Sequence, residues 1–430
     1  MKKSLLFALT VMVLILSLSF SASAQTTIQF AHFYDPAAGP AHVMNIEWLE
    51  RLVAAFEEEN PDIQVEFEWI KWDEIDVRAV RDYRAGVAHD VMLTSPQLYG
   101  LHDATGSLMD IGSYIDEWPE ERLADINWSP VWVSAYPYGV PLGIHTRAVA
   151  YRRDLYEEAG LNPDVTPGDP DELVEYAQKL TTDDVYGLGM YFGPVRATIE
   201  LYFAPYLWHF DGHLWDPETK MADFATEAGI EATEFLYDLI YTHGVTPEWS
   251  ISGTYDDVIL LNFLEGRIAQ AEGYGSYWIG PLEEQGWIEG LFPPTPEGET
   301  TVVDIFPTPT KDNAQFTNAW NISIHALSDK PDESFRFIEF LTQPEWLVDY
   351  PDAGLPALLS LWDSPELQTP FYQKWLAAAE SGRPMPPTAH YGDLADTVAA
   401  CLQQIFALGD PIPETLQQFQ DEYNAHFGGE

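Results

Sequence analysis

The segment with the clearest chemical character is Gly273–Gly280, which carries Tyr274, Tyr277 and Trp278 among glycines. Aromatic rings stack on the apolar faces of sugar rings, while neighbouring polar groups bind the hydroxyls. Glycines at the end of a strand leave the backbone accessible, so we expect these rings to project from a loop. The chain has 15 Trp, 22 Tyr and 22 Phe. Most of them are expected to pack in the core, and this segment is the best candidate for a sugar-binding surface.

Signatures of catalysis and metal binding are missing from the sequence. It contains no G-x-S-x-G elbow, no P-loop, no H-E-x-x-H and no EF-hand loop. His209 and His213 have the spacing of a helical metal pair, but Asp211 and Gly212 between them favour a turn. Among 69 Asp and Glu, no pair stands out as a glycosidase acid and base, although counting does not exclude one. We expect no catalytic residue, no metal and no cofactor.

The N-terminus predicts a secretory signal peptide over residues 1–24. Lys2 and Lys3 precede an apolar run, and Ala22-Ser23-Ala24 forms a cleavage site. The run is shorter than the ~20 residues that cross a bilayer. Cys401 is the only cysteine, so no intrachain disulfide forms and no cysteine at the cleavage site carries a lipid. We expect a protein free in the periplasm and not lipid-anchored.

The charge of the chain is strongly negative. The formal net charge is −49, and removal of the signal peptide leaves 18 Lys and Arg against 69 Asp and Glu, or −51. Such a surface repels nucleic acid and anionic lipid. It keeps a protein soluble, and it also suits a saline habitat; the sequence leaves both explanations open.

The order of the predicted elements favours two α/β lobes, for which 430 residues are sufficient. Strand patterns at 27–33 and 63–69 flank a helical pattern at 48–56, which is a β-α-β unit. Residues 138–160 combine turn residues, an apolar strand and a short helix ended by Gly160. We interpret this stretch as a crossing between lobes, near Leu142–Arg147, with a ligand cleft beside it. Proline clusters at 293–296 and 307–309 predict loops and a second crossing.

Seven short segments together carry a family resemblance. The first, Phe56-Glu-Glu-Glu-Asn-Pro-Asp-Ile-Gln-Val65, is a helix-to-strand passage ending in Asn-Pro-x-Ile-x-Val. The other six, in chain order, are Gly86–Val91, Gly106–Ile111, Val140-Pro141 with Tyr151–Gly160, Phe263–Ala269, Glu333–Thr342 and Glu414–Asn424. In this order they resemble the family-1 extracellular solute-binding proteins, the sugar receptors of ABC importers related to maltose-binding protein.

The resemblance implies an α/β fold of the two-lobe, type II periplasmic binding protein kind. Each lobe would be a mixed β-sheet flanked by helices, and hinge crossings would join the lobes. The implied limits are 25–142 and 307–356 for the N-terminal lobe, and 143–306 and 357–430 for the C-terminal lobe. The implied function is that of a monomeric, non-enzymatic substrate-binding protein, which captures a sugar or oligosaccharide and delivers it to the permease subunits of an ABC importer.

The family pattern also implies which residues face the ligand. These are His32, Tyr34, Asp35, Thr94, Ser95 and Gln97 from the first lobe, His145 at the hinge, and Arg196, Tyr274, Ser276, Tyr277, Trp278 and Tyr391 from the second. Two departures argue against a malto-oligosaccharide: Arg152-Arg153 replaces the usual Asn-Lys, and His145 stands where maltose receptors have a carboxylate. Arg196 and His145 as cationic donors suggest the hypothesis of an acidic sugar.

Two other functions fit the same features. A secreted carbohydrate-active hydrolase would also use aromatic residues and carboxylates. A sensory receptor would hand its closed form to a chemoreceptor or kinase instead of a permease.

Overall fold

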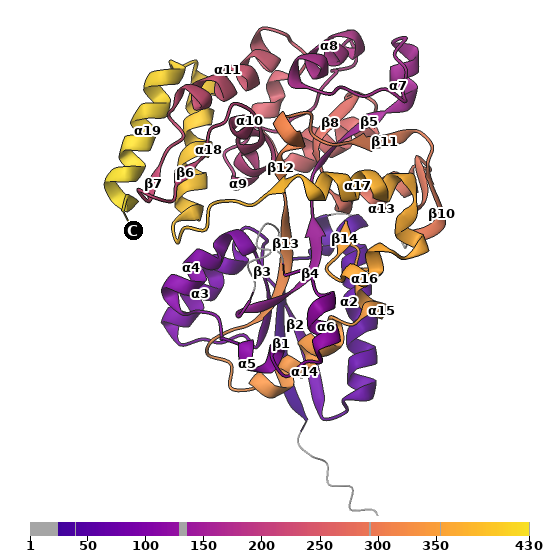
Figure 1. Cartoon of the computed structure of the whole chain (residues 1–430), viewed down its shortest axis with the longest axis vertical. Helices are drawn as coiled ribbons and strands as arrows, with labels where there is room; N and C mark the ends of the chain where they lie inside the picture. Colours follow the sequence, from indigo (N-terminus) through magenta and orange to yellow (C-terminus); the bar gives the residue numbers. More distant parts are fainter. Residues whose placement is uncertain (1–24, 39, 129–135, 292–293, 353, 430) are drawn as a thin grey trace, which may run out of the picture.

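The structure is a computed structural model that describes residues 25–38, 40–128, 136–291, 294–352 and 354–429, so the predicted signal peptide lies outside the described residues. Two α/β lobes lie one above the other, with the chain passing between them (Figure 1). The α/β class and the two lobes agree with the prediction. Within the described ranges, no helix combines the length and apolar character needed to cross a membrane.

The first lobe is built on one six-stranded sheet of order β14-β4-β13-β3-β1-β2. The strands are β1 Thr26–His32, β2 Ile63–Trp69, β3 Val91–Thr94, β4 Gly139–His145, β13 Asn318–Ile324 and β14 Leu355–Pro356. Strand β1 is parallel to β2 and β3, whereas β13 is antiparallel to both β3 and β4. The carboxyl ends of β1 to β4 and the start of β13 therefore share one edge of the sheet, and this edge faces the second lobe (Figure 1).

Helices cover the faces of this sheet. They are η1 Pro36–Ala38, α2 Pro40–Glu59, α3 Ile75–Ala85, η2 Pro96–Leu98, α4 Tyr99–Thr105, α5 Gly112–Ile115, α6 Glu120–Asp125, α14 Pro331–Leu341, α15 Pro344–Leu347 and α16 Leu359–Trp362. Helix α2 buries Trp48, Leu52 and Phe56, which recur on one helical face as the sequence predicted. Helix α3 ends at Gly86, whose φ of 72° is the left-handed conformation that glycine adopts without strain.

The second lobe has a smaller central sheet of order β11-β5-β8, with all strands antiparallel. Its strands and the short paired strands around it are β5 Ala148–Arg152, β6 Trp215–Asp216, β7 Met221–Ala222, β8 Gln270–Tyr274, β9 Ile288–Leu291, β10 Pro294–Thr300, β11 Val303–Phe306, β12 Gln315–Phe316 and β15 Gly382–Arg383. Its helices are α7 Arg153–Glu158, α8 Pro170–Leu180, α9 Arg196–Thr198, the π-helix η3 Ile199–Phe203, α10 Ala204–His209, α11 Glu227–Tyr241, η4 Glu248–Ile251, the π-helix η5 Asp256–Leu260, α12 Leu261–Leu264, η6 Ser276–Trp278, α13 Ile279–Glu284, η7 Lys311–Asn313, η8 Pro365–Gln368, α17 Pro370–Glu380, α18 Tyr391–Leu408 and α19 Ile412–Phe427.

The chain passes between the lobes at two adjacent points. Strand β4 ends at His145, which pairs with Asn318, the first residue of β13. The first crossing is therefore Thr146-Arg147, and the second is Thr317, between β12 and β13. The hydroxyls of Thr146 and Thr317 are 3.0 Å apart and hydrogen-bonded. A third passage follows β14 and leads to α17 (Figure 1).

The predicted lobe limit at 142/143 precedes the first crossing by three residues, and the limit at 306/307 precedes the second by ten. Pairing of β4 with β13 continues to His145, so 143–145 lie in the first sheet. Strand β12 pairs with β15, and Phe316 packs in the core of the second lobe, so residues 311–316 lie in that lobe.

The proline cluster at 293–296 was predicted to be a loop, but Pro294 and Pro296 lie in β10, which pairs with β9. An edge position tolerates proline because no second strand needs its missing N–H.

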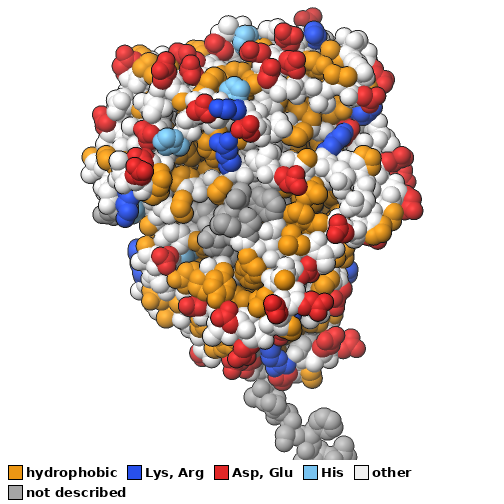
Figure 2. Space-filling view, in the orientation of Figure 1, with side chains coloured by type: hydrophobic (Ala, Val, Ile, Leu, Met, Phe, Trp, Pro, Cys, Tyr) orange, Lys and Arg blue, Asp and Glu red, His pale blue; other side chains and the backbone are white. Residues whose placement is uncertain are grey.

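The outer surface is dominated by carboxylates. Figure 2 shows acidic side chains spread over both lobes on the visible face, with far fewer basic ones. Repulsion among these charges destabilises the compact state.

We therefore expect salt to stabilise the mature protein, because the Debye length falls from about 30 Å at 0.01 M to about 3 Å at 1 M. Raising NaCl over this range should increase the unfolding temperature by several degrees in a thermal melt. The same NaCl series near pH 4, where many of the carboxyl groups are protonated, is the control. An equal increase at the lower pH would contradict a role for charge repulsion.

Candidate ligand-binding site

A cavity of about 220 Å³ lies between the two lobes, beside the crossings. Its lining comprises Phe33, Tyr34, His42, Asn45, Trp72, Gln97, His145, Arg147, Arg196, Ala197, Glu200, Leu201, Tyr255, Tyr277, Phe316, Asn318, Trp320 and Asp352. Aromatic side chains and charged side chains come from both lobes. The cavity thus combines stacking surfaces with convergent polar groups, as binding sites for small polar ligands do.

The first lobe contributes residues at the edge of its sheet that faces the second lobe. Tyr34 follows β1, Trp72 follows β2, and Gln97 lies in η2 just after β3. His145 ends β4, and Trp320 lies near the start of β13. Ligands of open α/β sheets bind in the crevice outside the carboxyl ends of the strands, because loops from several strands converge there.

The second lobe contributes residues from its loops and from irregular helices. Arg147 lies in the first crossing, and Arg196 begins α9. Glu200 lies in the π-helix Ile199–Phe203, and Tyr255 immediately precedes the π-helix Asp256–Leu260. A π-helical turn is rare and occurs frequently at functional sites.

Three contacts join the lobes around the cavity. The Gln97 side-chain amide donates to Glu200 Oε1 over 3.3 Å, and the Arg196 guanidinium lies 5.0 Å from the ring centre of Trp72. Ser276 Oγ donates to the backbone oxygen of Asp352 over 2.8 Å. The lobes are therefore closed upon each other, and both sides of the cavity are fixed by interlobe bonds.

Glu200 is the most heavily bonded acid of the cavity. Its Oε1 accepts from Tyr391 at 2.9 Å and lies 3.2 Å from Nε of Arg196. Burial raises the pKa of Glu200, while the adjacent Arg196 acts in the opposite direction.

His145 and Asp352 form a second polar pair, across 3.9 Å from Nε2 to Oδ2. Burial raises the pKa of Asp352 to about 7, and burial holds the pKa of His145 well below its usual value. His145 is thus a neutral imidazole near pH 7, which corrects the hypothesis that it is a cationic donor. The cationic side chain at this end of the cavity is Arg147 instead.

Five of the predicted ligand-facing residues line the cavity: Tyr34, Gln97, His145, Arg196 and Tyr277. Their contact with a ligand remains a prediction. The other predicted residues of the first lobe lie outside the lining, and their side chains form hydrogen bonds within that lobe. His32 Nδ1 accepts from the Tyr34 amide, and Asp35 accepts from the Ala37 amide. Thr94 and Ser95 are bonded to Ser323 and Asp76.

In the second lobe, the aromatic segment 273–280 turns inward rather than projecting from a loop. Tyr274 and Trp278 are fully buried, with ring centres 5.4 Å apart in an edge-to-face contact. Ser276 and Tyr391 lie outside the lining and contact it indirectly, through Asp352 and Glu200. Only Tyr277 of this segment reaches the cavity.

Several residues of the lining were missed from the sequence. Trp72 comes soon after the strand predicted at 63–69, so the strand end was a usable signal for it, whereas Trp320 lies near the start of β13. Arg147 lies in the crossing that the sequence did identify. Glu200 lies among bulky aromatic residues, where nothing in the sequence marks the π-helix. Asp352 lies just before β14, far along the chain from the other residues of the first lobe that line the cavity.

A Ser–His–Asp arrangement exists in the first lobe but lies away from the cavity. His102 is bonded to Ser107 Oγ over 2.7 Å and to Asp76 Oδ1 over 3.0 Å. All three residues are buried, with at most 1 % exposed, so this serine is inaccessible to a substrate. The arrangement therefore joins α3 to α4 and offers no nucleophile.

The two histidines with metal-like spacing have separate partners. His209 Nδ1 accepts from the Lys311 amide, and His213 Nε2 lies 2.9 Å from Asp223. Within the described residues, no group of three or more His, Cys, Asp or Glu is arranged to hold a metal.

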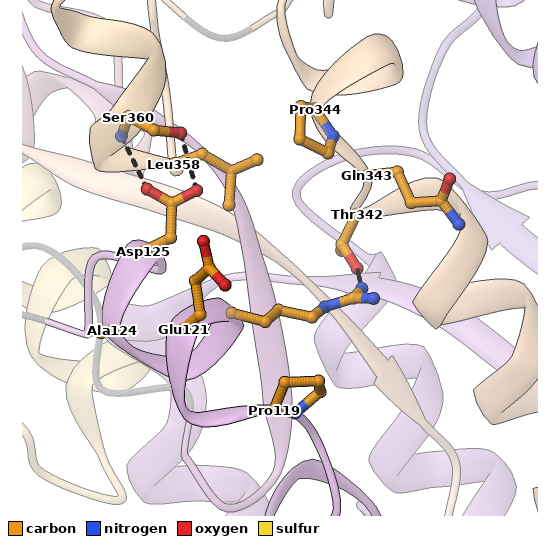
Figure 3. A pocket seen from close by; sticks show the side chains of 10 residues that line it. Pro119, Glu121, Ala124, Asp125, Thr342, Gln343, Pro344, Leu358 and Ser360 are labelled. Atoms are coloured by element: carbon orange, nitrogen blue, oxygen red, sulfur yellow. Dashed lines mark hydrogen bonds between the residues drawn. The ribbon is translucent and has the colours of Figure 1, made fainter.

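A second hollow, of about 640 Å³, lies on the outside of the first lobe between α6, α15 and α16 (Figure 3). Its polar groups bond to one another. Asp125 accepts from both the amide and the hydroxyl of Ser360 at 2.7 Å, and Arg122 donates to Thr342 Oγ1 at 2.9 Å. Although larger, this hollow is formed by one lobe alone, so the interlobe cavity is the better candidate site.

Comparisons with known proteins agree with this architecture. The family model for bacterial extracellular solute-binding proteins matches residues 45–347. A Brucella abortus (strain 2308) protein, named as a binding protein, is 23% identical over 413 residues, covering 94% of this chain and 93% of its own.

Two solved structures are similar over the whole of their length. One is a solute-binding protein of Thermotoga lettingae TMO bound with α-D-tagatose, with TM-score 0.77, 21% identity, and coverage of 94% of this chain and 100% of that one. The other is T. maritima MalE3 bound to maltose, with TM-score 0.77, 21% identity, and coverage of 93% and 100%. The type II two-lobe fold predicted from the sequence is confirmed.

The raised pKa of Asp352 gives a testable prediction. The folded protein holds this proton up to about pH 7, whereas the ordinary pKa is 3.8. Between about pH 4 and pH 7, Asp352 ionises in the unfolded chain but keeps its proton in the folded protein. The wild type therefore loses stability as the pH rises through this range. Asp352→Asn cannot ionise, so the free energy of unfolding of the variant minus that of the wild type should increase by about 1–3 kcal/mol across this range and then level off.

Urea unfolding at a series of pH values measures this difference, in which the contributions of histidines cancel. Glu158→Gln, which removes an exposed carboxyl of α7, is the control and should give a nearly constant difference above about pH 5. A constant difference for Asp352→Asn would mean that Asp352 ionises in the folded protein as it does in the unfolded chain.

Proposed function

Because the chain belongs to the bacterial extracellular solute-binding protein family, we propose that it is the periplasmic substrate-binding protein of an ABC importer. It captures a sugar in the interlobe cavity and delivers it to permease subunits in the inner membrane. The signal peptide predicted at 1–24 supports export to the periplasm.

The observation that carries the proposal is the composition of the cavity. Trp72 and Trp320 from the first lobe and Tyr277 from the second offer ring faces for stacking. Gln97, Asn318 and the charged residues offer donors and acceptors for hydroxyls. We take a single sugar or polyol as the occupant of this cavity of about 220 Å³.

Ligand capture follows from the division of the lining between lobes. A sugar touching both Trp72 and Tyr277 gains those contacts only when the lobes are closed. Its binding therefore shifts the open–closed equilibrium toward the closed form, by an amount limited to its differential affinity for the two forms. The adjacent crossings at Thr146 and Thr317 are suited to serve as the hinge.

Binding to purified protein tests the proposal. A panel of monosaccharides, polyols and disaccharides should include a ligand that raises the unfolding temperature, and calorimetry then gives its affinity. Trp72→Ala should weaken this ligand by about tenfold or more through loss of stacking. Trp69→Ala is a matched control, because Trp69 is 50% exposed, ends the strand that Trp72 follows and lies outside the lining.

The same samples distinguish a receptor from a hydrolase. A receptor returns the sugar chemically intact after long incubation, as mass spectrometry would show. Consumption of the sugar that is abolished by Glu200→Gln or Asp352→Asn would contradict the proposal, since those acids lie in the cavity. Equal affinities of Trp72→Ala and Trp69→Ala would place the ligand elsewhere.

A further inference from the structure

We propose that the ligand of this cavity carries a carboxylate, as a uronate or an aldonate does, and that Arg147 and Arg196 bind that group. The inference rests on the proposed function and names the class of sugar. It derives from the hydrogen-bonding state of two guanidinium groups and from the charge balance of the lining.

The cavity departs from the charge balance of the chain. The whole sequence has 20 Lys and Arg against 69 Asp and Glu, whereas the lining has two arginines and two acids. The lining of the interlobe cavity thus has a higher proportion of cationic to acidic side chains than the chain as a whole. Since the remaining surface repels anions, an anionic ligand needs local positive charge at its site.

Arg196 is nine-tenths buried, with 9% of its surface exposed. A guanidinium has five N–H donors and does not lose its proton in proteins. The Nη2 group of Arg196 is buried and has no hydrogen-bond partner among the residues that the structure describes. Its neighbour Glu200 lies 3.2 Å from Nε, but the same Oε1 already accepts from Gln97 and Tyr391. Arg196 therefore retains unused donors in the cavity.

Arg147 is the freer of the two cations. Its Nη1 donates to the backbone oxygen of Thr146 over 2.9 Å, and its guanidinium lies 5.9 Å from the ring centre of Phe316. Its Nε is buried without a hydrogen-bond partner, and within the described part of the chain Arg147 forms no ion pair. Arg147 is half-buried, and its charge lowers the pKa of both Asp352 and Glu200 in opposition to burial. A bidentate carboxylate is the partner whose geometry matches a guanidinium with an unused buried donor.

The two acids of the lining repel a ligand carboxylate less than two full negative charges would. Glu200 is engaged by Arg196, Gln97 and Tyr391, so its charge is balanced within the protein. Burial raises the pKa of Asp352 to about 7, which leaves this group largely protonated just below neutral pH. The two arginines keep their charge under the same conditions, so the balance of the cavity is positive.

Calorimetry with matched pairs of ligands tests the proposal on the full mature chain. The pairs are D-glucuronate with D-glucose, D-galacturonate with D-galactose, and D-gluconate with D-sorbitol, so each pair differs chiefly in its carboxylate. In at least one pair, the acid should bind about tenfold or more tightly than its neutral partner. Charge-assisted hydrogen bonds have this magnitude.

Two variants assign the effect to the arginines. Arg147→Gln should weaken the acid by about tenfold to hundredfold and the neutral sugar far less. Arg196→Lys keeps the charge but loses the planar fork, so it should weaken the acid to a smaller degree. Arg267→Gln removes one positive charge from an exposed position of the same lobe and should leave both affinities unchanged. Thermal unfolding verifies that each variant is folded.

The outcomes separate this inference from the proposed function. If a neutral sugar binds as tightly as its acid, or if Arg147→Gln weakens both equally, the carboxylate inference is wrong and the receptor function stands. If no member of any pair binds although another sugar of the panel does, the carboxylate inference is again wrong and the receptor function stands. If no sugar of the panel binds, or if a sugar is consumed, the proposed function fails and this inference fails with it.

Discussion

The structure depends on one constraint, the antiparallel pairing of β4 with β13. Because these strands run in opposite directions, the end of β4 and the start of β13 lie at the same edge of the sheet. The chain must then leave the first lobe at Thr146 and return at Thr317, two points joined by a hydrogen bond of 3.0 Å. Such a pair of adjacent crossings allows the lobes to rotate as rigid bodies while the sheet stays intact. The cavity lies beside the crossings because β1, β2 and β3 end at the same edge as β4.

Burial acts differently on the ionisable groups that meet there. It holds His145 neutral and raises the pKa of Asp352 to about 7, since the charged form of each is disfavoured away from water. Arg147 and Arg196 keep their charge because a guanidinium is not deprotonated in proteins. A strongly acidic protein thus places two permanently charged arginines in an enclosed site, without a large number of basic residues.

The sequence predicted the framework well and the site in part. Strand and helix periodicity identified the β-α-β unit of the first lobe, and the family pattern implied Tyr34 and Gln97. Both residues follow parallel strands, whose loops converge by topology alone. The second lobe was harder to predict, since its cavity residues come from a crossing and from a π-helix that periodicity does not reveal. Tyr274 illustrates the difficulty. Its segment has the composition of an exposed binding loop, yet packing against Trp278 and Trp375 turns its ring into the core.

In the proposed receptor, ligand binding is coupled to lobe closure because the two lobes contribute different side chains to the cavity. The second lobe supplies both arginines, while Trp72 and Trp320 belong to the first. In the closed form Arg196 lies against Trp72 and beside Glu200, yet its Nη2 is buried without an acceptor. Burying a donor that has no acceptor opposes closure, whereas a ligand acceptor in the cavity offsets that cost. The same buried donors that would recognise the ligand therefore make the closed form less favourable when the cavity holds none.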